Sequence, residues 1–161
     1  MPMRVLLVVM LVAVAWLAGC ATIRPPDGLG VVERPMVVTG YCKCGQCCGW
    51  ERNWFGRAVF SSGPKKGKRK LVGQTARGTM ARHGTIAADP ARYPFGTVMY
   101  ISGYGYRRVE DTGSGVRGDH IDLYFHSHGA ALDWGKQRKV VRIWLPGSAL
   151  ARSGESSVDH P

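Results

Sequence analysis

The sequence predicts a small all-β barrel with one short helix. From Leu71 onward, short β-branched and aromatic runs alternate with glycine and proline turns, and a single segment has a helical pattern. The 161 residues fit one domain, and they contain no internal repeat and no internal membrane span. Many short strands with so little helix are typical of a small barrel.

The N-terminus is predicted to be a lipoprotein signal peptide covering residues 1–19. Arg4 precedes an apolar run, Val5 to Trp16, which leads into Leu17-Ala18-Gly19-Cys20. Small residues before a cysteine predict that Cys20 is the first mature residue and carries lipid. An uncleaved anchor and an ordinary signal peptide are the alternatives. Ala21 after Cys20 favours sorting to an outer membrane, so we expect a lipid-anchored protein of the cell envelope that faces the periplasm.

Residues 20–35 are rich in proline and glycine and predict a flexible tether, and residues 147–161 predict a disordered tail. The domain between them, residues 36–146, opens with a β-branched strand from Met36 to Tyr41. Ser127 to Trp134 is the predicted helix, with Ser127 as its cap and Gly135 as its end. The other predicted strands are Thr85–Ala88, Thr97–Ile101, Tyr106–Asp111, His120–Tyr124 and Lys139–Leu145.

The charge balance is strongly basic, with 22 Lys and Arg against 11 Asp and Glu, a net charge of +11. Such a protein favours polyanions. An exported chain meets anionic wall polymers and lipid headgroups, so we expect no nucleic-acid partner. The basic run of residues 64–70 is interpreted as a solvated insertion, with a polymer-binding patch as the alternative.

Three aspartates stand at the ends of, or inside, predicted strands. Asp89 and Asp111 precede turn residues, where an aspartate often only bonds to nearby backbone amides. Asp122 lies between Ile121 and Leu123, where a carboxylate is costly unless it is hydrogen-bonded or functional. The pattern therefore favours an acid/base function for Asp122 and leaves both interpretations open for the other two.

Four cysteines follow the first strand within seven residues. In an exported protein disulfides are the default, and four cysteines allow three pairings. Cys42 with Cys48 and Cys44 with Cys47 is the sterically easiest pairing. A metal site and free thiols are the alternatives, but structural zinc sites usually draw ligands from two separated pairs. We therefore expect no metal, and the histidines, including His126 and His128, show no zinc-protease spacing.

Several motifs in order resemble the three-aspartate (3D) domain. They include Gly84-Thr-Ile-Ala-Ala-Asp89, Pro94-Phe-Gly-Thr97, Glu110-Asp111-Thr-Gly-Ser-Gly-Val-Arg-Gly118 and Ile121-Asp122-Leu-Tyr124. The resemblance covers roughly Val37 to Leu145. It also extends to the catalytic barrel of the membrane-bound lytic transglycosylase A family. It implies a six-stranded double-psi β-barrel.

The resemblance also implies a function. The interval from Asp111 to Asp122 and the segment Asp122-Leu123-Tyr124 match the transglycosylase motif, so Asp122 would be the single acid/base that cuts the MurNAc–GlcNAc bond. Asp111 would be its partner and Asp89 the third member. From the same motifs we expect Thr75, Arg117, His120 and Tyr124 to contact the glycan.

The transglycosylase has a second domain that completes its groove, and this chain has no room for one. A binding module that holds peptidoglycan without cleaving it is therefore the alternative, and an inert envelope lipoprotein is a third. We expect a monomer without a cofactor.

Overall fold

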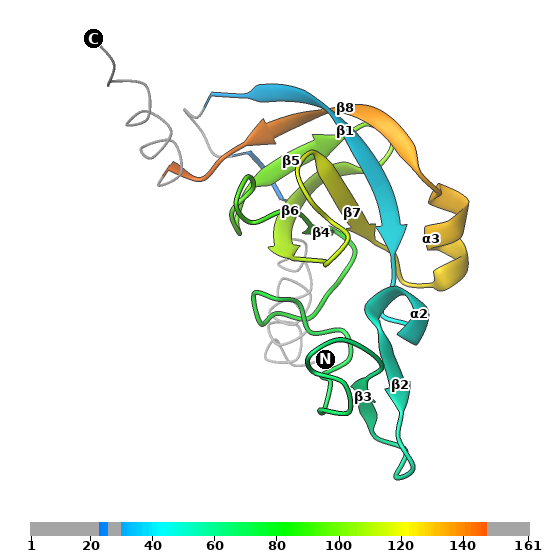
Figure 1. Ribbon diagram of the computed structural model, residues 1–161. Helices are drawn as coiled ribbons and strands as arrows, with labels where there is room; N and C mark the ends of the chain where they lie inside the picture. Colours follow the sequence, from blue (N-terminus) through cyan, green and yellow to red (C-terminus); the bar gives the residue numbers. More distant parts are fainter. Residues whose placement is uncertain (1–22, 26–29, 148–161) are drawn as a thin grey trace, which may run out of the picture.

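The computed structural model describes residues 23–25 and 30–147, and these form a closed barrel with a side extension (Figure 1). The predicted signal peptide with Cys20 and residues 148–161 of the predicted tail lie outside the described residues. Within the described part of the chain, no helix has the length and apolar character needed to cross a membrane.

Six strands close the barrel in the order β1-β7-β4-β6-β5-β8. Two neighbouring pairs, β1 with β7 and β4 with β6, are parallel, and the remaining four are antiparallel. This confirms the predicted small all-β barrel. The barrel strands are β1 (Val32–Tyr41), β4 (Thr85–Ala87), β5 (Val98–Ile101), β6 (Gly105–Asp111), β7 (His120–Tyr124) and β8 (Gln137–Trp144).

The alternation of β7 separates the core from the outer surface. Ile121 and Leu123 are fully buried in the barrel core, so His120, Asp122 and Tyr124 point to the outer face. Burying one such aliphatic side chain stabilises the fold by about 1.5–3 kcal/mol. The core also takes Met36, Val38, Ile86, Met99, Ile101, Val109, Val141 and Ile143 from the other strands.

The first strand begins earlier than predicted. Residues 32–35, expected to end the tether, are the start of β1 and pair with β8, with Pro35 opposite Val140. Proline argues against a central strand, but β1 pairs with β8 alone until Val37 joins β7, and proline is tolerated on such an edge.

The predicted helix is confirmed as α3 (His128–Trp134). Ser127 caps it by accepting a hydrogen bond from the Ala130 amide, and Gly135 ends it. The helix packs on β1 (Figure 1), where Gly40 permits close contact because a Cβ there would lie 2.9 Å from the Ala131 carbonyl oxygen.

Between β1 and β4 the chain leaves the barrel and builds a small extension. It contains α2 (Gly45–Cys48), which was not predicted, and a two-stranded sheet of β2 (Trp50–Arg52) and β3 (Ala58–Phe60). The basic residues 64–69 are exposed, as expected of a solvated insertion, whereas Lys70 is half-buried. In Figure 1 this extension lies at one end of the barrel.

Candidate functional site

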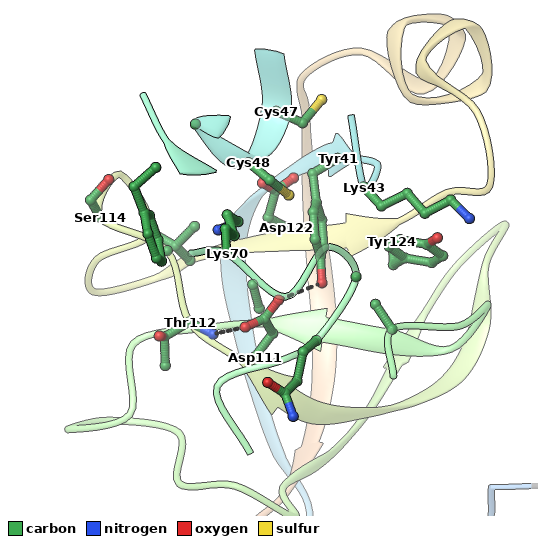
Figure 2. A pocket seen from close by; sticks show the side chains of 18 of the residues that line it. Tyr41, Lys43, Cys47, Cys48, Lys70, Asp111, Thr112, Ser114, Asp122 and Tyr124 are labelled. Carbon is green, nitrogen blue, oxygen red and sulfur yellow. Dashed lines mark hydrogen bonds between the residues drawn. The ribbon is translucent and has the colours of Figure 1, made fainter. Parts of the chain in front are cut away.

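A cleft of about 370 Å³ lies where the extension meets the outer face of the barrel (Figure 2). Its lining includes two of the three predicted aspartates. Tyr41 and Tyr124 form an aromatic part of the wall, and Cys47 and Cys48 of α2 lie beside them. Lys43 and Lys70 add positive charge to the lining.

The backbone register places Asp111 and Asp122 on either side of one small residue. Ala87 of β4 pairs with Asp111 of β6 on one side and with Asp122 of β7 on the other, and Thr39 of β1 is opposite Asp122. At the usual strand spacing the two aspartate Cα atoms are about 10 Å apart. These paired residues form a row across the strands, and the small side chain of Ala87 leaves room for a ligand over it.

A break in strand register points Asp111 into this row. Ile86 pairs with Val109, but the next residue, Ala87, pairs with Asp111 and skips Glu110. Without the extra residue, strict alternation would put Asp111 on the same side as buried Val109. The bulge therefore turns its carboxyl group to the outer face. Glu110 stays buried, where it accepts a hydrogen bond from the Thr85 hydroxyl (3.3 Å).

Three donors fix the Asp111 carboxyl group. The Tyr41 hydroxyl donates to Oδ2 at 2.9 Å, and the amides of Ala76 and Thr112 each donate to Oδ1 at 2.9 Å. Figure 2 shows two of these contacts at the floor of the cleft. Burial and the Asp111 charge raise the pKa of Tyr41 far above its ordinary value, so this hydroxyl stays a donor.

Asp122 is half-buried and faces the same cleft. Burial raises the pKa of Asp122 above its ordinary value, and the negative charge of Asp111 adds to this rise. The hydrogen bond from Thr39 (2.9 Å to Oδ1) and the neighbouring His120 act in the opposite direction but do not outweigh burial. A carboxyl group in this setting retains its proton to a higher pH than a solvated one.

Thr39 connects Asp122 to His120. Its Oγ1 lies 2.8 Å from Nε2 of His120, and Nδ1 of His120 lies 3.1 Å from the Gly115 carbonyl oxygen. Since a carbonyl only accepts, Nδ1 carries a proton. Two arrangements then satisfy every contact: an ionised Asp122 with a charged imidazole, or a protonated Asp122 with a neutral one. Both contain the same number of protons.

The third predicted aspartate lies elsewhere. Asp89 does not line the cleft, and its two oxygens accept hydrogen bonds from the amides of Ala91 (3.1 Å) and Gly118 (2.9 Å). These amide donors hold its pKa below the ordinary value. The contacts are those of a turn-forming residue that fastens the loop before β7.

Of the four residues predicted to contact the glycan, two belong to the cleft region and two lie elsewhere. Tyr124 lines the cleft, and His120 reaches it through Thr39. Thr75 is buried against Thr79 (2.9 Å), and exposed Arg117 lies near Asp89, so neither lines the cleft. Thr39, Tyr41 and Lys70 were not predicted as site residues, because their roles depend on cross-strand register and on the fold of the extension.

The predicted disulfides are not formed. Cys42, Cys44, Cys47 and Cys48 are free thiols, and the sulfurs of Cys42 and Cys47 are 3.9 Å apart, against about 2.05 Å in a disulfide. The Cys48 thiol instead donates to the Cys42 carbonyl oxygen at 3.1 Å. The α2 turn gathers the sulfurs of Cys42, Cys44 and Cys47 within 4.8 Å of one another, and neither predicted pair is bonded.

Comparison with known proteins finds a family match in the second half of the chain. Residues 84–146 match the family described as the 3D domain. The match contains Asp89, Asp111 and Asp122, and it confirms the three-aspartate resemblance over this part of the sequence.

Two Bacillus subtilis proteins are similar over part of the chain. YabE, to which a role in cell wall shaping is ascribed, is 35% identical over 75 residues, which are 44% of this chain and 18% of YabE. The cell wall-binding protein YocH is 36% identical over 58 residues, which are 36% of this chain and 20% of YocH. The chain thus spans about a fifth of the length of these relatives.

Among solved structures, MltA from E. coli aligns with 44% of this chain and 26% of its own, at 20% identity and a TM-score of 0.36. This likeness is too low to carry the fold assignment, which rests on the strand order of the barrel itself.

Proposed function

We propose that this chain, which carries a 3D domain over residues 84–146, cleaves the glycan strands of peptidoglycan as a lytic transglycosylase. The observation that carries the proposal is the setting of Asp122, half-buried in an open cleft with a raised pKa and with Asp111 across Ala87. The names of the two Bacillus relatives favour the cell wall as the source of the substrate.

In the first step, Asp122 acts as general acid. Its carboxylic acid gives a proton to the oxygen that joins MurNAc to GlcNAc, and the bond between that oxygen and C1 of MurNAc breaks. The GlcNAc part leaves as an alcohol, and positive charge develops on the MurNAc ring. The cost of burial favours the protonated form that this step needs.

In the second step, the same carboxylate acts as general base. It takes the proton from the 6-hydroxyl of MurNAc while that oxygen attacks C1, which closes a 1,6-anhydro ring. The proton returns to Asp122, and no water is consumed. One carboxyl group therefore suffices, whereas a glycosidase that uses water normally requires two.

Asp111 supplies negative charge beside the developing positive charge. Its three donors, from Tyr41, Ala76 and Thr112, hold it in one orientation, so its field is arranged before the reaction begins. The same charge keeps Asp122 protonated to a higher pH.

Thr39 and His120 act as positioning residues. When Asp122 is protonated, it donates to Thr39 and the Thr39 hydroxyl donates to Nε2 of His120. When Asp122 has given its proton to the leaving oxygen, the Thr39 hydroxyl turns to donate to the carboxylate, and His120 stays neutral because it has gained no proton. The turn of this hydroxyl stabilises the ionised acid after the first step without a solvent proton.

A binding module that does not cleave is the second candidate. YocH is named for cell wall binding, and this chain spans only about a fifth of its length. Lys43 and Lys70 in the cleft lining are available to hold anionic groups of wall polymers.

The proposed setting is the cell envelope, with a lipid on Cys20 holding a monomeric domain near the glycan. Retention of the protein in the membrane fraction, and its loss on Cys20→Ala, would test the anchor. The matching control is Cys48→Ser, which leaves the predicted lipidation motif intact.

Digestion of purified sacculi tests the activity. The protein is incubated with sacculi, and the soluble products are separated and weighed by mass spectrometry. Release of 1,6-anhydro-muropeptides supports the transglycosylase, and release of reducing-end products supports a hydrolase instead. Sacculus binding without any soluble product supports the binding module.

A further inference from the structure

We propose that Cys42, Cys44, Cys47 and His128 bind one Zn²⁺ ion that fastens the end of β1 to the start of α3. The three sulfurs and one imidazole nitrogen all lie within 4.8 Å of one another. This inference concerns the architecture beside the cleft, and it stands whether or not the chain cleaves glycan.

The distances match the edges of a zinc tetrahedron. With Zn–S near 2.3 Å and Zn–N near 2.0–2.1 Å, tetrahedral angles separate two sulfurs by about 3.8 Å and a sulfur from a nitrogen by about 3.6 Å. The Cys42 and Cys47 sulfurs are 3.9 Å apart, and Nδ1 of His128 lies 3.6 Å from the Cys44 sulfur and 3.4 Å from the Cys47 sulfur.

Backbone amides support the sulfurs as they do in metal-thiolate turns. The Cys44 amide donates to the Cys42 sulfur, and the Cys47 amide donates to the Cys44 sulfur, each at 3.4 Å. Such donors stabilise thiolates and orient them. Gly45 permits this tight path, because a Cβ there would lie 2.3 Å from the Trp50 carbonyl oxygen.

The fourth ligand comes from a distant part of the chain. His128 is the first residue of α3, 81 positions after Cys47, and the cap at Ser127 sets where the helix begins. Close packing of α3 on β1 at Gly40 brings this histidine to the cysteine turn. Three cysteines and one histidine are one of the ligand sets of structural zinc, and here the histidine from a second element completes what the single cysteine segment lacks.

The donor set selects the ion. Three thiolates and an imidazole suit Zn²⁺ and do not suit Mg²⁺ or Ca²⁺, which prefer oxygen. Four protein ligands leave no position for substrate, so the ion would be structural. It would hold α2, and with it Cys47 and Cys48, against the cleft.

Metal analysis of the full-length protein, purified without chelator, tests the site. We expect about one zinc per chain by mass spectrometry of the native protein. Cys47→Ser and His128→Ala should lose the metal. Their controls, Cys48→Ser and His126→Ala, should retain it, because the sulfur of Cys48 and the ring of His126 are not in the cluster. Removal of zinc by chelator should lower Tm by roughly 10 °C or more, and added zinc should restore it.

A second measurement does not depend on the folding of any variant. The wild-type protein is denatured in chelator without reductant, alkylated and mapped by mass spectrometry. Alkylation of Cys42, Cys44 and Cys47 supports the zinc site. Disulfides among these cysteines would overturn it. In the metal analysis, the proposal would be overturned by less than a tenth of an equivalent of bound zinc, or by equal loss of zinc in the Cys47→Ser and Cys48→Ser variants.

Discussion

Asp111 and Asp122 lie on the two strands that flank Ala87, and both line one cleft. They are separated by the loop between β6 and β7. A register break between β4 and β6 is needed to turn Asp111 to this face. The pair differs in its surroundings. Asp111 has three hydrogen-bond donors, whereas Asp122 is held by one hydroxyl and has a raised pKa. Two carboxyl groups with unequal environments suit two different roles in acid/base chemistry.

Replacement of Asp111 should shift the pH dependence of cleavage. The negative charge of Asp111 raises the pKa of Asp122, so Asp111→Asn lowers that pKa and the acid form is lost at a lower pH. The alkaline limb of the pH–rate profile should therefore shift to lower pH. The control is Asp133→Asn, an exposed carboxylate outside the cleft, which should leave the limb in place. A limb that shifts to higher pH, or that does not shift, contradicts the assignment of Asp122 as the acid influenced by Asp111.

Thr39 offers a matched pair of substitutions. Thr39→Val removes the hydroxyl that donates to Asp122, so the pKa of Asp122 rises and the alkaline limb moves to higher pH. We expect a fall in kcat of roughly tenfold, because the ionised acid loses the hydrogen bond from the Thr39 hydroxyl. Thr39→Ser keeps the hydroxyl and should behave almost as wild type. Equal behaviour of the two variants in the pH–rate profile would argue against this role of the hydroxyl.

The hydroxyl of Tyr41 should contribute measurably to stability. Its hydrogen bond to the Asp111 carboxyl group is partly buried at the cleft, and bonds to charged groups contribute about 1.5–3 kcal/mol. Tyr41→Phe should lower the free energy of unfolding by about 1–2 kcal/mol in urea titrations. Tyr124→Phe is the control, since no hydrogen bond joins that hydroxyl to another described residue. A larger loss in the control would contradict the assigned contact.

Asp89 should affect stability and leave the chemistry intact. Its pKa is lowered in the folded state, so its contribution is present above the ordinary pKa of aspartate and is lost as pH falls through the lowered value. Asp89→Ala should reduce Tm at neutral pH, and the difference from wild type should shrink in acid. Thermal unfolding between pH 7 and about pH 2 measures this. Loss of cleavage in a folded Asp89→Ala protein would instead indicate that Asp89 takes part in catalysis.

The barrel could be predicted because its strands have strong local signals. His120–Tyr124 alternates apolar and polar residues and is flanked by turns, and the structure has the same bounds. The helix after Ser127 was marked by a cap and a terminal glycine. Each signal depends on neighbouring residues alone, which a sequence displays directly.

Non-local features could not be predicted in the same way. The bulge at Glu110 depends on how β6 pairs with β4, so the sequence did not show that Asp111 would reach the cleft while Asp89 would not. The sequence predicts disulfides at the cysteine turn because an exported chain favours them, and because four thiols in one short segment argue against a zinc site. His128 joins them only after α3 packs on β1.

Digestion of sacculi by the wild-type and Asp122→Asn proteins tests the central claim most directly. Asn cannot donate or accept the proton, so release of 1,6-anhydro-muropeptides should fall by about 10²–10⁴-fold. Binding to sacculi and Tm should be retained, since removal of a carboxyl group that burial disfavours in its charged form does not harm the fold. Undiminished release of 1,6-anhydro products by a folded Asp122→Asn protein would contradict the assignment of Asp122 as the acid.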